Sequence, residues 1–163
     1  MPIADVKPLD VPRIATGIAE FDRVLGGGIV PGSVALLGGD PGIGKSTLLL
    51  QAAAALAGRG RRVLYATSEE SAAQVKLRAD RLDGSADAER GRNLLLLAEP
   101  NVAVIAEECR RTAPDLLVLD SIQLAFRGDI DAVPGSLLQL RRCCLDLVSM
   151  AKTAGVAVAV VGH

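Results

Sequence analysis

Aromatic residues are almost absent from this chain of 163 residues, which contains one Tyr, two Phe and no Trp. Half of the residues are hydrophobic, so the core must be built mainly from aliphatic side chains. The scarcity of rings also excludes a platform of several aromatic side chains on which the bases of a single strand could stack. The length and the hydrophobic content together fit one domain with a sizeable core.

An excess of charge of either sign is also lacking. The chain has 18 Lys and Arg against 19 Asp and Glu, for a formal net charge of −1. There is therefore no overall basic field that would hold a polyanion. Short basic runs occur at 58–62, 89–92, 110–111 and 141–142, but such runs are more often solvated surface than a nucleic-acid patch. If the chain binds DNA, we expect it to do so through local loops.

Cysteine and histidine are equally scarce. The three cysteines, Cys109, Cys143 and Cys144, form no C-x-x-C pair, and the only histidine is His163. This pattern argues against a zinc site or a disulfide framework. No apolar stretch reaches the roughly 18 residues of a membrane helix, and the first residues lack the basic and apolar regions of a signal peptide. We therefore expect a cytoplasmic protein with no membrane partner.

Short apolar runs alternate with helical patterns along most of the chain. Residues 1–12 contain three prolines and are predicted to form an extended linker, so the domain is expected to span 13–163. The alternation favours an α/β fold with a mostly parallel, twisted sheet covered by helices on both faces. Predicted helices are 17–25 capped by Thr16, 45–58, 71–82 with a capping box of Ser71 and Gln74, 102–112 capped by Asn101, and about 134–154. Predicted strands are 33–39, 61–68, 93–98, 115–121 and 156–162.

The stretch GGDPGIGKSTLLLQ fits the phosphate-loop pattern G-x-x-x-x-G-K-[ST] and stands between a predicted strand and a predicted helix. Its glycines let backbone N–H groups approach phosphate oxygens, and the following helix offers its positive end. Lys45 can reach the β and γ phosphates, and the Ser46 hydroxyl suits Mg²⁺. The predicted nucleotide-binding residues are Gly39, Asp40, Pro41, Gly42, Ile43, Gly44, Lys45, Ser46 and Thr47.

Hydrolysis of a triphosphate also requires carboxylates. Asp120 ends an apolar strand, where it would emerge beside the phosphate loop and serve the metal, although such an acid also occurs as a plain strand end or helix cap. Glu69 and Glu70 follow another strand and are candidates for activating water, with Glu69 favoured. The alternative is that both acids only complement the positive end of the next helix. His163 follows the last predicted strand, so it should lie at the same edge, unless it is simply a disordered end residue.

Six segments in this order carry a resemblance: TGIAEFDRVLGGGIVPGS, GGDPGIGKSTLLLQ, VLYATSEESAAQVKLRA, LLVLDSIQ, PGSLLQLRR and VAVVGH. Together they resemble the ATPase core of the bacterial RadA (Sms) family, within the RecA-like superfamily of P-loop NTPases. The resemblance implies an ATP- and Mg²⁺-dependent, DNA-stimulated branch-migration helicase of recombinational repair that works as a hexameric ring. It also implies a recombinase as a candidate partner. Members usually have Gly where this chain has Ser68.

The resemblance also assigns roles to residues. It implies that Lys45 and Ser46 contact phosphate and magnesium, that Glu69 activates water, and that Asp120 is the acid of the second nucleotide motif. It places His163 at the γ-phosphate sensor position. A first DNA-binding loop would lie at 125–135, which includes Phe126 and Arg127, and a second would begin after His163.

Several parts expected of a full-length member are not in this sequence: a four-cysteine zinc module, a KNRFG motif and a domain like that of Lon protease. We therefore expect an ATPase core truncated on its C-terminal side, which binds ATP and Mg²⁺ but hydrolyses slowly without the family's trans-acting Lys and Arg. Two alternatives remain. One is an autokinase signalling domain like KaiC, and the other is a nucleotide-dependent interaction domain without significant turnover.

Overall fold

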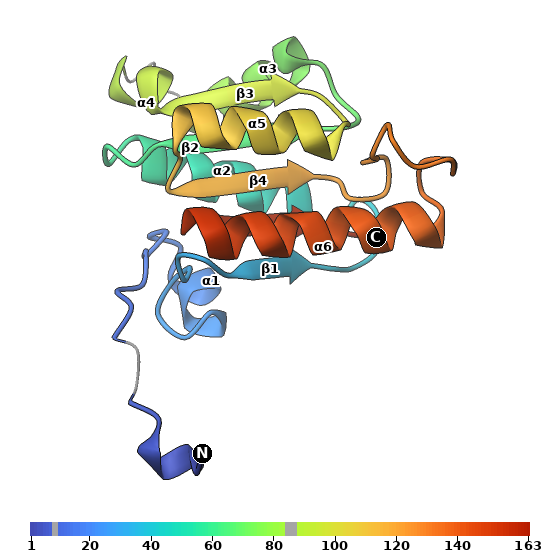
Figure 1. Cartoon of the computed structure of the whole chain (residues 1–163). Coiled ribbons are helices and arrows are strands. Elements are labelled where there is room, and N and C mark those ends of the chain that lie inside the picture. Colours follow the sequence, from blue (N-terminus) through green and yellow to red (C-terminus); the bar gives the residue numbers. More distant parts are fainter. Residues whose placement is uncertain (8–9, 84–87) are drawn as a thin grey trace.

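The computed structural model of the chain describes residues 1–7, 10–83 and 88–163. In this part of the chain, parallel strands form one sheet in the order β1-β5-β4-β2-β3 (Figure 1). The elements are a 3-10 helix at Ile3–Asp5, α1 (Ala19–Val24), β1 (Val34–Leu37), α2 (Lys45–Ala57), β2 (Val63–Thr67), α3 (Ala72–Asp83), α4 (Ala88–Asn93), β3 (Leu94–Ala98), α5 (Val102–Thr112), β4 (Leu116–Asp120), α6 (Leu137–Ala154) and β5 (Ala157–Val161). The predicted α/β class and parallel sheet are confirmed.

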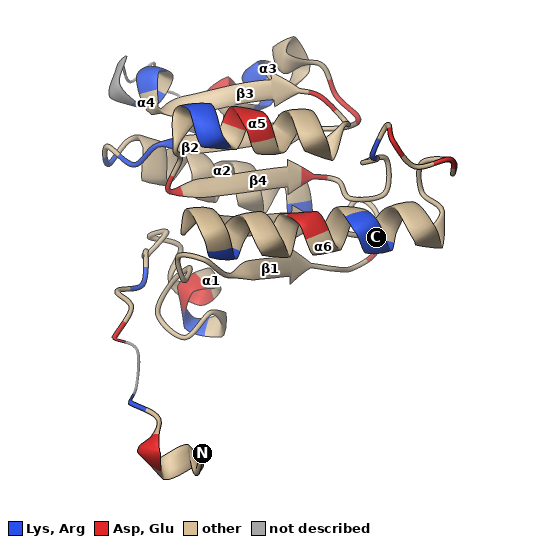
Figure 2. Cartoon of the chain, in the orientation of Figure 1, with Lys and Arg blue, Asp and Glu red and all other residues tan. Residues whose placement is uncertain are grey.

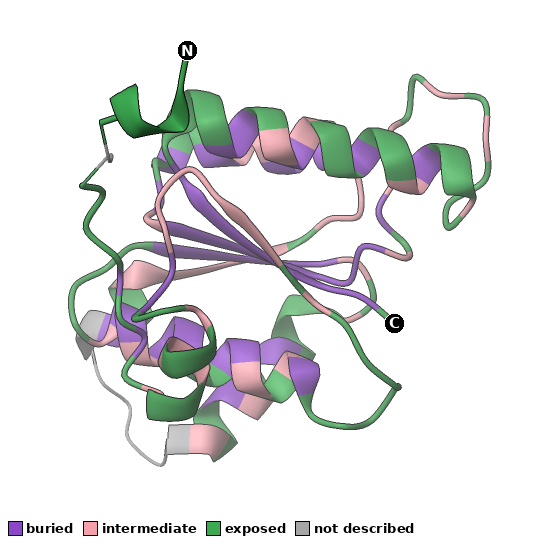
Figure 3. Cartoon of the chain, turned by 90° about the horizontal axis from the view of Figure 1, so that it is seen from below, coloured by how far each residue is buried: buried purple, intermediate pink, exposed green. Residues whose placement is uncertain are grey.

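Two hydrophobic clusters occupy opposite faces of the sheet. Buried residues of α2 and α3 pack on one face, and buried residues of α5 and α6 pack on the other. Figure 3 shows the buried strands lying between these two helical layers. Every residue of β2, β4 and β5 is buried, as expected for parallel strands covered on both sides. This packing fixes where each strand ends, and therefore where the loops that follow it emerge.

Two of the predicted helix caps are confirmed. The side chain of Asn101 accepts a hydrogen bond from the Ala103 N–H at 3.0 Å, which caps α5. The Gln74 side-chain oxygen accepts from the Ser71 N–H at 2.8 Å, while the Ser71 hydroxyl lies 3.3 Å from the Gln74 nitrogen, so the capping box forms at the start of α3. Local side chains therefore set these two helix starts.

Other boundaries differ from the prediction. The first helix begins at Ala19 and not at residue 17, because the Thr16 hydroxyl is engaged with Asp22 at 2.7 Å. The last helix begins at Leu137, after the Ser136 cap, and not near residue 134. α4 was not predicted, and its sequence AERGRN has no apolar periodicity that would indicate a helix. The predicted extended linker contains a 3-10 turn at Ile3–Asp5, on a segment that stands away from the sheet in Figure 1.

Glycine is required where the chain returns from α1 to the sheet. Ile14 and Ile29 form an antiparallel bridge, with N–H···O distances of 2.8 Å in both directions. Gly28 lies beside this bridge with φ of +137°, and a Cβ there would stand 2.5 Å from the carbonyl oxygen of Ile14. A side chain at this position would therefore force the bridge open.

Charges of both signs are interspersed over the surface. Figure 2 shows basic and acidic segments on both α5 and α6, in keeping with the near-zero net charge. Among the described residues, no helix is both long and apolar enough to span a bilayer.

One carboxylate organises the start of the domain, and its substitution should change the acid stability. Asp22 accepts hydrogen bonds from the Thr16 N–H at 2.9 Å, the Thr16 hydroxyl at 2.7 Å and the Gly17 N–H at 2.9 Å. Burial alone would raise the pKa of Asp22, but these hydrogen bonds outweigh it and hold the pKa below its usual value. The carboxylate therefore contributes stability above the unfolded-state pKa of about 3.9, and this contribution is lost as the pH falls through the lower folded-state pKa.

We expect Asp22→Asn to lower the free energy of unfolding by about 1 kcal/mol at pH 7. Below about pH 4, the difference in the free energy of unfolding between the variant and the unchanged protein should become smaller. Urea denaturation at both pH values measures this. Glu20→Gln on the same helix is the control, because the ion pair between Glu20 and Arg23 is exposed to solvent and should contribute little. A gap between Asp22→Asn and the unchanged protein that stays constant with pH would contradict the assignment.

Candidate functional site

The sheet order brings the predicted site residues to one edge. Because all the strands are parallel, their carboxyl ends meet at the side to which the arrows point in Figure 1. The phosphate loop follows β1, His163 follows β5, Asp120 ends β4, and Glu69 and Glu70 follow β2. Since β1, β5, β4 and β2 are successive neighbours in the sheet, segments far apart in sequence lie side by side.

The phosphate loop wraps around the start of α2. Gly44 is the N-cap residue with φ of +98°, a left-handed conformation that glycine adopts without strain, and the helix begins at Lys45. The first N–H groups of this 13-residue helix have no partner within the helix and can bind an anion. A cavity of about 230 Å³ opens here, lined by Gly42, Gly44, Lys45, Ser46, Thr47, Arg78 and His163.

Lys45 is held at this cavity by the loop itself. Its side chain is largely buried, and Nζ donates to the carbonyl oxygens of Gly39 at 2.7 Å and Asp40 at 2.6 Å. Asp40, Pro41 and Ile43, which were also predicted to bind nucleotide, are exposed, and none of the three lines this cavity.

Beside the phosphate cavity lies a smaller one of about 160 Å³, lined by Ser46, Thr67, Glu69, Glu70, Arg78 and Asp120. Hydroxyl and carboxylate oxygens are the ligands that Mg²⁺ takes in proteins, usually together with phosphate oxygens and water. The described residues contain no group of three or more His, Cys, Asp or Glu that could hold a metal without such help. The donor set therefore fits a magnesium ion that is shared with a bound phosphate chain.

Asp120 is fixed by a tyrosine that the sequence analysis did not single out. The Tyr65 hydroxyl donates to Asp120 Oδ2 at 2.7 Å, and both residues are buried. Burial, reinforced by the charge and the hydrogen bond of Asp120, raises the pKa of Tyr65 far above its usual range, so the tyrosine remains a neutral donor. The sequence pattern alone does not reveal this contact, because it depends on the register that pairs Thr67 with Asp120 and so places Tyr65, two residues earlier, on the same face of the sheet.

Glu69 is positioned by a hydroxyl and lies near the histidine. Ser121 Oγ donates to Glu69 Oε1, and His163 Nε2 lies 3.9 Å from the same oxygen. Ser121 is itself held by Ser68, whose Oγ donates to the Ser121 carbonyl at 2.8 Å and accepts from the Ser121 N–H at 3.1 Å. Ser68, where a glycine was expected, therefore ties the end of β2 to the end of β4.

Glu70 takes a different partner from its neighbour. Its Oε2 lies 2.6 Å from Nη2 of Arg78. Arg78 belongs to α3 and was not among the predicted site residues. The same guanidinium nitrogen lies 3.8 Å from Asp120 Oδ2. The two adjacent glutamates thus take different partners, and in the part of the chain that the structure describes the Glu69 carboxylate forms no ion pair with an arginine.

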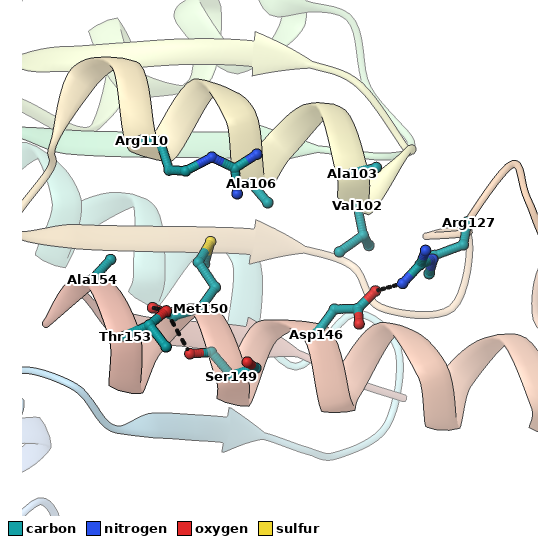
Figure 4. Close-up of a pocket in the computed structure, with 10 residues that line it drawn as sticks. All are labelled: Val102, Ala103, Ala106, Arg110, Arg127, Asp146, Ser149, Met150, Thr153 and Ala154. Atoms are coloured by element: carbon teal, nitrogen blue, oxygen red, sulfur yellow. Dashed lines mark hydrogen bonds and ion pairs between the residues drawn. The ribbon is translucent and has the colours of Figure 1, made fainter.

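The predicted DNA-binding loop at 125–135 lies outside both of these cavities. Its backbone is held by the buried Gln139 of α6, which accepts from the Arg127 N–H at 2.9 Å and donates to the carbonyl oxygens of Arg127 at 3.1 Å and Ala132 at 2.9 Å. The Arg127 guanidinium pairs with Asp129 at 2.6 Å. It also pairs with Asp146 of α6 at 2.7 Å, as Figure 4 shows. With one Arg and two Asp the loop carries a formal charge of −1, and its arginine is already neutralised.

A larger cavity of about 600 Å³ lies between α5 and α6, with Arg110, Met150 and Thr153 among its lining residues (Figure 4). These helices cover the face of the sheet opposite to α2, and none of the predicted nucleotide-binding residues lines this cavity. The cavity is therefore separate from the candidate nucleotide site.

Known proteins match this chain over nearly its whole length. Proteins described as "DNA repair protein RadA" are 48% identical in Halalkalibacterium halodurans over 162 residues, 46% identical in Bacillus subtilis over 162 residues and 48% identical in Streptococcus pneumoniae over 163 residues. These alignments cover 99%, 99% and 100% of this chain, but only 34%, 34% and 37% of the respective relatives. The chain thus spans about a third of the length of the relatives that it matches.

A family model described as "AAA domain" matches residues 2–163. The match includes the phosphate loop, the paired glutamates, Asp120 and His163, which the fold brings to one edge of the sheet. From residue 2 to its last residue, this chain belongs to the AAA domain family.

Proposed function

We propose that this chain is the ATP-binding core of a DNA-dependent ATPase that drives branch migration in recombinational DNA repair. The observation that carries the proposal is the arrangement at one sheet edge of a phosphate loop, a buried aspartate and a glutamate that a serine hydroxyl holds in place. The similarity to RadA proteins over nearly the whole chain supports the repair role.

The residues divide the chemistry between them. Lys45 and the first N–H groups of α2 would bind the β and γ phosphates, while Ser46 directly and Asp120 through water would hold Mg²⁺, which neutralises phosphate charge when bound. Glu69 would accept a proton from the attacking water, whose oxygen forms a bond to the γ-phosphorus as the bond to the bridging oxygen breaks. His163, 3.9 Å from Glu69, would sense the γ-phosphate, and Glu70 would hold the neighbouring arginine.

The partners of this core are proposed from the resemblance to the RadA family. Single-stranded or branched DNA would contact the loop at 125–135 and a second loop beyond His163. The full-length protein would assemble as a hexameric ring in which a neighbouring subunit completes the ATPase site, and it would cooperate with a recombinase. A core without these additions is expected to bind ATP and to turn it over only slowly.

An autokinase domain of the KaiC kind would use the same phosphate loop and paired glutamates. The relatives compared above are DNA repair proteins, and this favours the motor over the kinase. Transfer of the γ-phosphoryl group of labelled ATP to the protein would reverse the preference, whereas release of inorganic phosphate supports the ATPase.

ATP binding tests the core of the proposal. We expect Lys45→Ala to weaken the binding of a fluorescent ATP analogue with Mg²⁺ by about 10- to 100-fold, because the variant loses a charge-assisted contact with phosphate. Fluorescence titration measures the dissociation constants. Lys76→Ala is the matched control, since Lys76 is exposed on α3, pairs with Asp80 and lines neither cavity of the site. Equal affinities of the two variants, or no binding by the unchanged protein, would refute the proposed function.

A further inference from the structure

Arg78 occupies a position in the candidate site that no recognised nucleotide motif explains. It lies on α3, and its Nη2 stands between Glu70 Oε2 at 2.6 Å and Asp120 Oδ2 at 3.8 Å. The side chain is only 27% exposed, so the guanidinium lies inside the site and not on its rim. A cation is therefore placed among the acids that the proposed mechanism uses.

The same side chain lines both cavities of the site. It borders the cavity of about 160 Å³ that contains the carboxylates, and also the cavity of about 230 Å³ formed by the phosphate loop. Lys45, Arg78 and His163 are the basic side chains that line the second cavity. Arg78 thus stands at the boundary between the acids and the place where phosphates would lie.

One nitrogen of this guanidinium is unsatisfied. Arg78 Nε is buried and has no hydrogen-bond partner in the described part of the chain. A buried donor without an acceptor is costly, so the contacts with Glu70 and Asp120 do not account for the whole group. Phosphate oxygens are strong acceptors, and the planar fork of a guanidinium matches them better than an ammonium group does.

We propose that Arg78 is a phosphate-binding residue that contacts the terminal phosphate of ATP from within the same subunit. The proposal rests on the proposed function, because it needs ATP in the loop. When a triphosphate is bound, the guanidinium turns from Asp120 toward the γ-phosphate and Asp120 becomes free to serve Mg²⁺. Without a γ-phosphate, the guanidinium remains on the two carboxylates and offsets their mutual repulsion.

Discrimination between ATP and ADP tests this assignment, because only ATP carries the phosphate that Arg78 would contact. Calorimetric titration of the full-length protein with a non-hydrolysable ATP analogue and with ADP, both with Mg²⁺, measures the two affinities. We expect Arg78→Gln to lower the affinity for the ATP analogue by about 10- to 100-fold and the affinity for ADP by less than about 3-fold. The control Arg81→Gln, on the same helix but exposed, should leave both affinities unchanged.

Arg78→Lys keeps the positive charge but replaces the planar guanidinium by an ammonium group. It is the second test variant, and it keeps the proposal testable if Arg78→Gln does not fold. We expect Arg78→Lys to lower the affinity for the ATP analogue by about 3- to 10-fold and to leave the affinity for ADP unchanged. An equal loss of affinity for both nucleotides, or no loss for either, would show that Arg78 only holds the acids and would overturn the assignment. If the unchanged protein does not bind the ATP analogue, or if Lys45→Ala binds it equally well, the proposed function fails as well. The two failures are therefore distinguishable.

Discussion

Glu69→Gln should lower the rate of ATP hydrolysis by the full-length protein about 10²- to 10⁴-fold, the usual contribution of a general base. The amide has nearly the shape of the carboxylate but cannot accept the proton of the attacking water. Glu69 is suited to this task because its carboxylate is held by Ser121 Oγ and, among the described residues, forms no ion pair with an arginine. Steady-state phosphate release, with and without single-stranded DNA, measures the effect.

The matched variant is Glu70→Gln, one residue away. Its carboxylate is bound to Arg78 at 2.6 Å, so we expect a smaller fall in turnover, of about 10-fold or less, through the loosened arginine. The affinity of Glu69→Gln for ATP should stay within about 3-fold of the unchanged protein, which separates loss of chemistry from loss of binding. If the Glu70 variant has the larger defect, the roles of the two glutamates are reversed. Unchanged turnover in Glu69→Gln would instead favour an interaction domain that does not depend on hydrolysis.

The second large effect is expected in the core. Leu117 lies in β4, is fully buried, and belongs to the cluster beneath α5 and α6. Leu117→Ala should lower the free energy of unfolding by about 2–5 kcal/mol, because it removes buried methyl groups and leaves a cavity that a fully covered strand cannot collapse to fill. Urea denaturation followed by circular dichroism measures the change.

Leu145→Ala on α6 is the control for this substitution. Its side chain is 60% exposed, so the same truncation should change the free energy of unfolding by no more than about 0.5 kcal/mol. Leu117→Ala also bears on the candidate site, because Leu117 lies in β4 and this strand ends in Asp120. Similar losses for the two leucine variants would mean that the layer of α5 and α6 does not pack against the sheet as described.

Much of this fold follows from patterns within short stretches of sequence. The apolar runs of β2, β4 and β5 and the caps at Ser71 and Asn101 depend on neighbours a few residues away, so they could be predicted. α4 could not, because no apolar period indicates it. Thr16 is not the cap residue for a different reason: its hydroxyl donates to Asp22 and accepts from the N–H of Ile18, and Ile18 is the residue that precedes the helix.

The site shows the same division. The motif residues were identified because their spacing is local, and the parallel sheet explains why they meet at one edge. Tyr65 and Asp120 are 55 residues apart in the chain, and Ser121 and Glu69 are 52 apart. Those contacts, like the contact of Arg78 with Asp120, depend on which strands are neighbours, and periodicity alone does not reveal this. The residues that orient the motif therefore required the structure.

The buried amide of Gln139 determines how the loop at 125–135 can move. One side chain holds the backbone of this loop at Arg127 and again at Ala132, so one part cannot open without releasing the other. Amide hydrogen exchange in the loop should therefore report a single cooperative opening and not independent fraying of its residues. A nucleic acid that bound here would meet a segment that is already ordered, and it would not bear the entropic cost of folding a disordered loop.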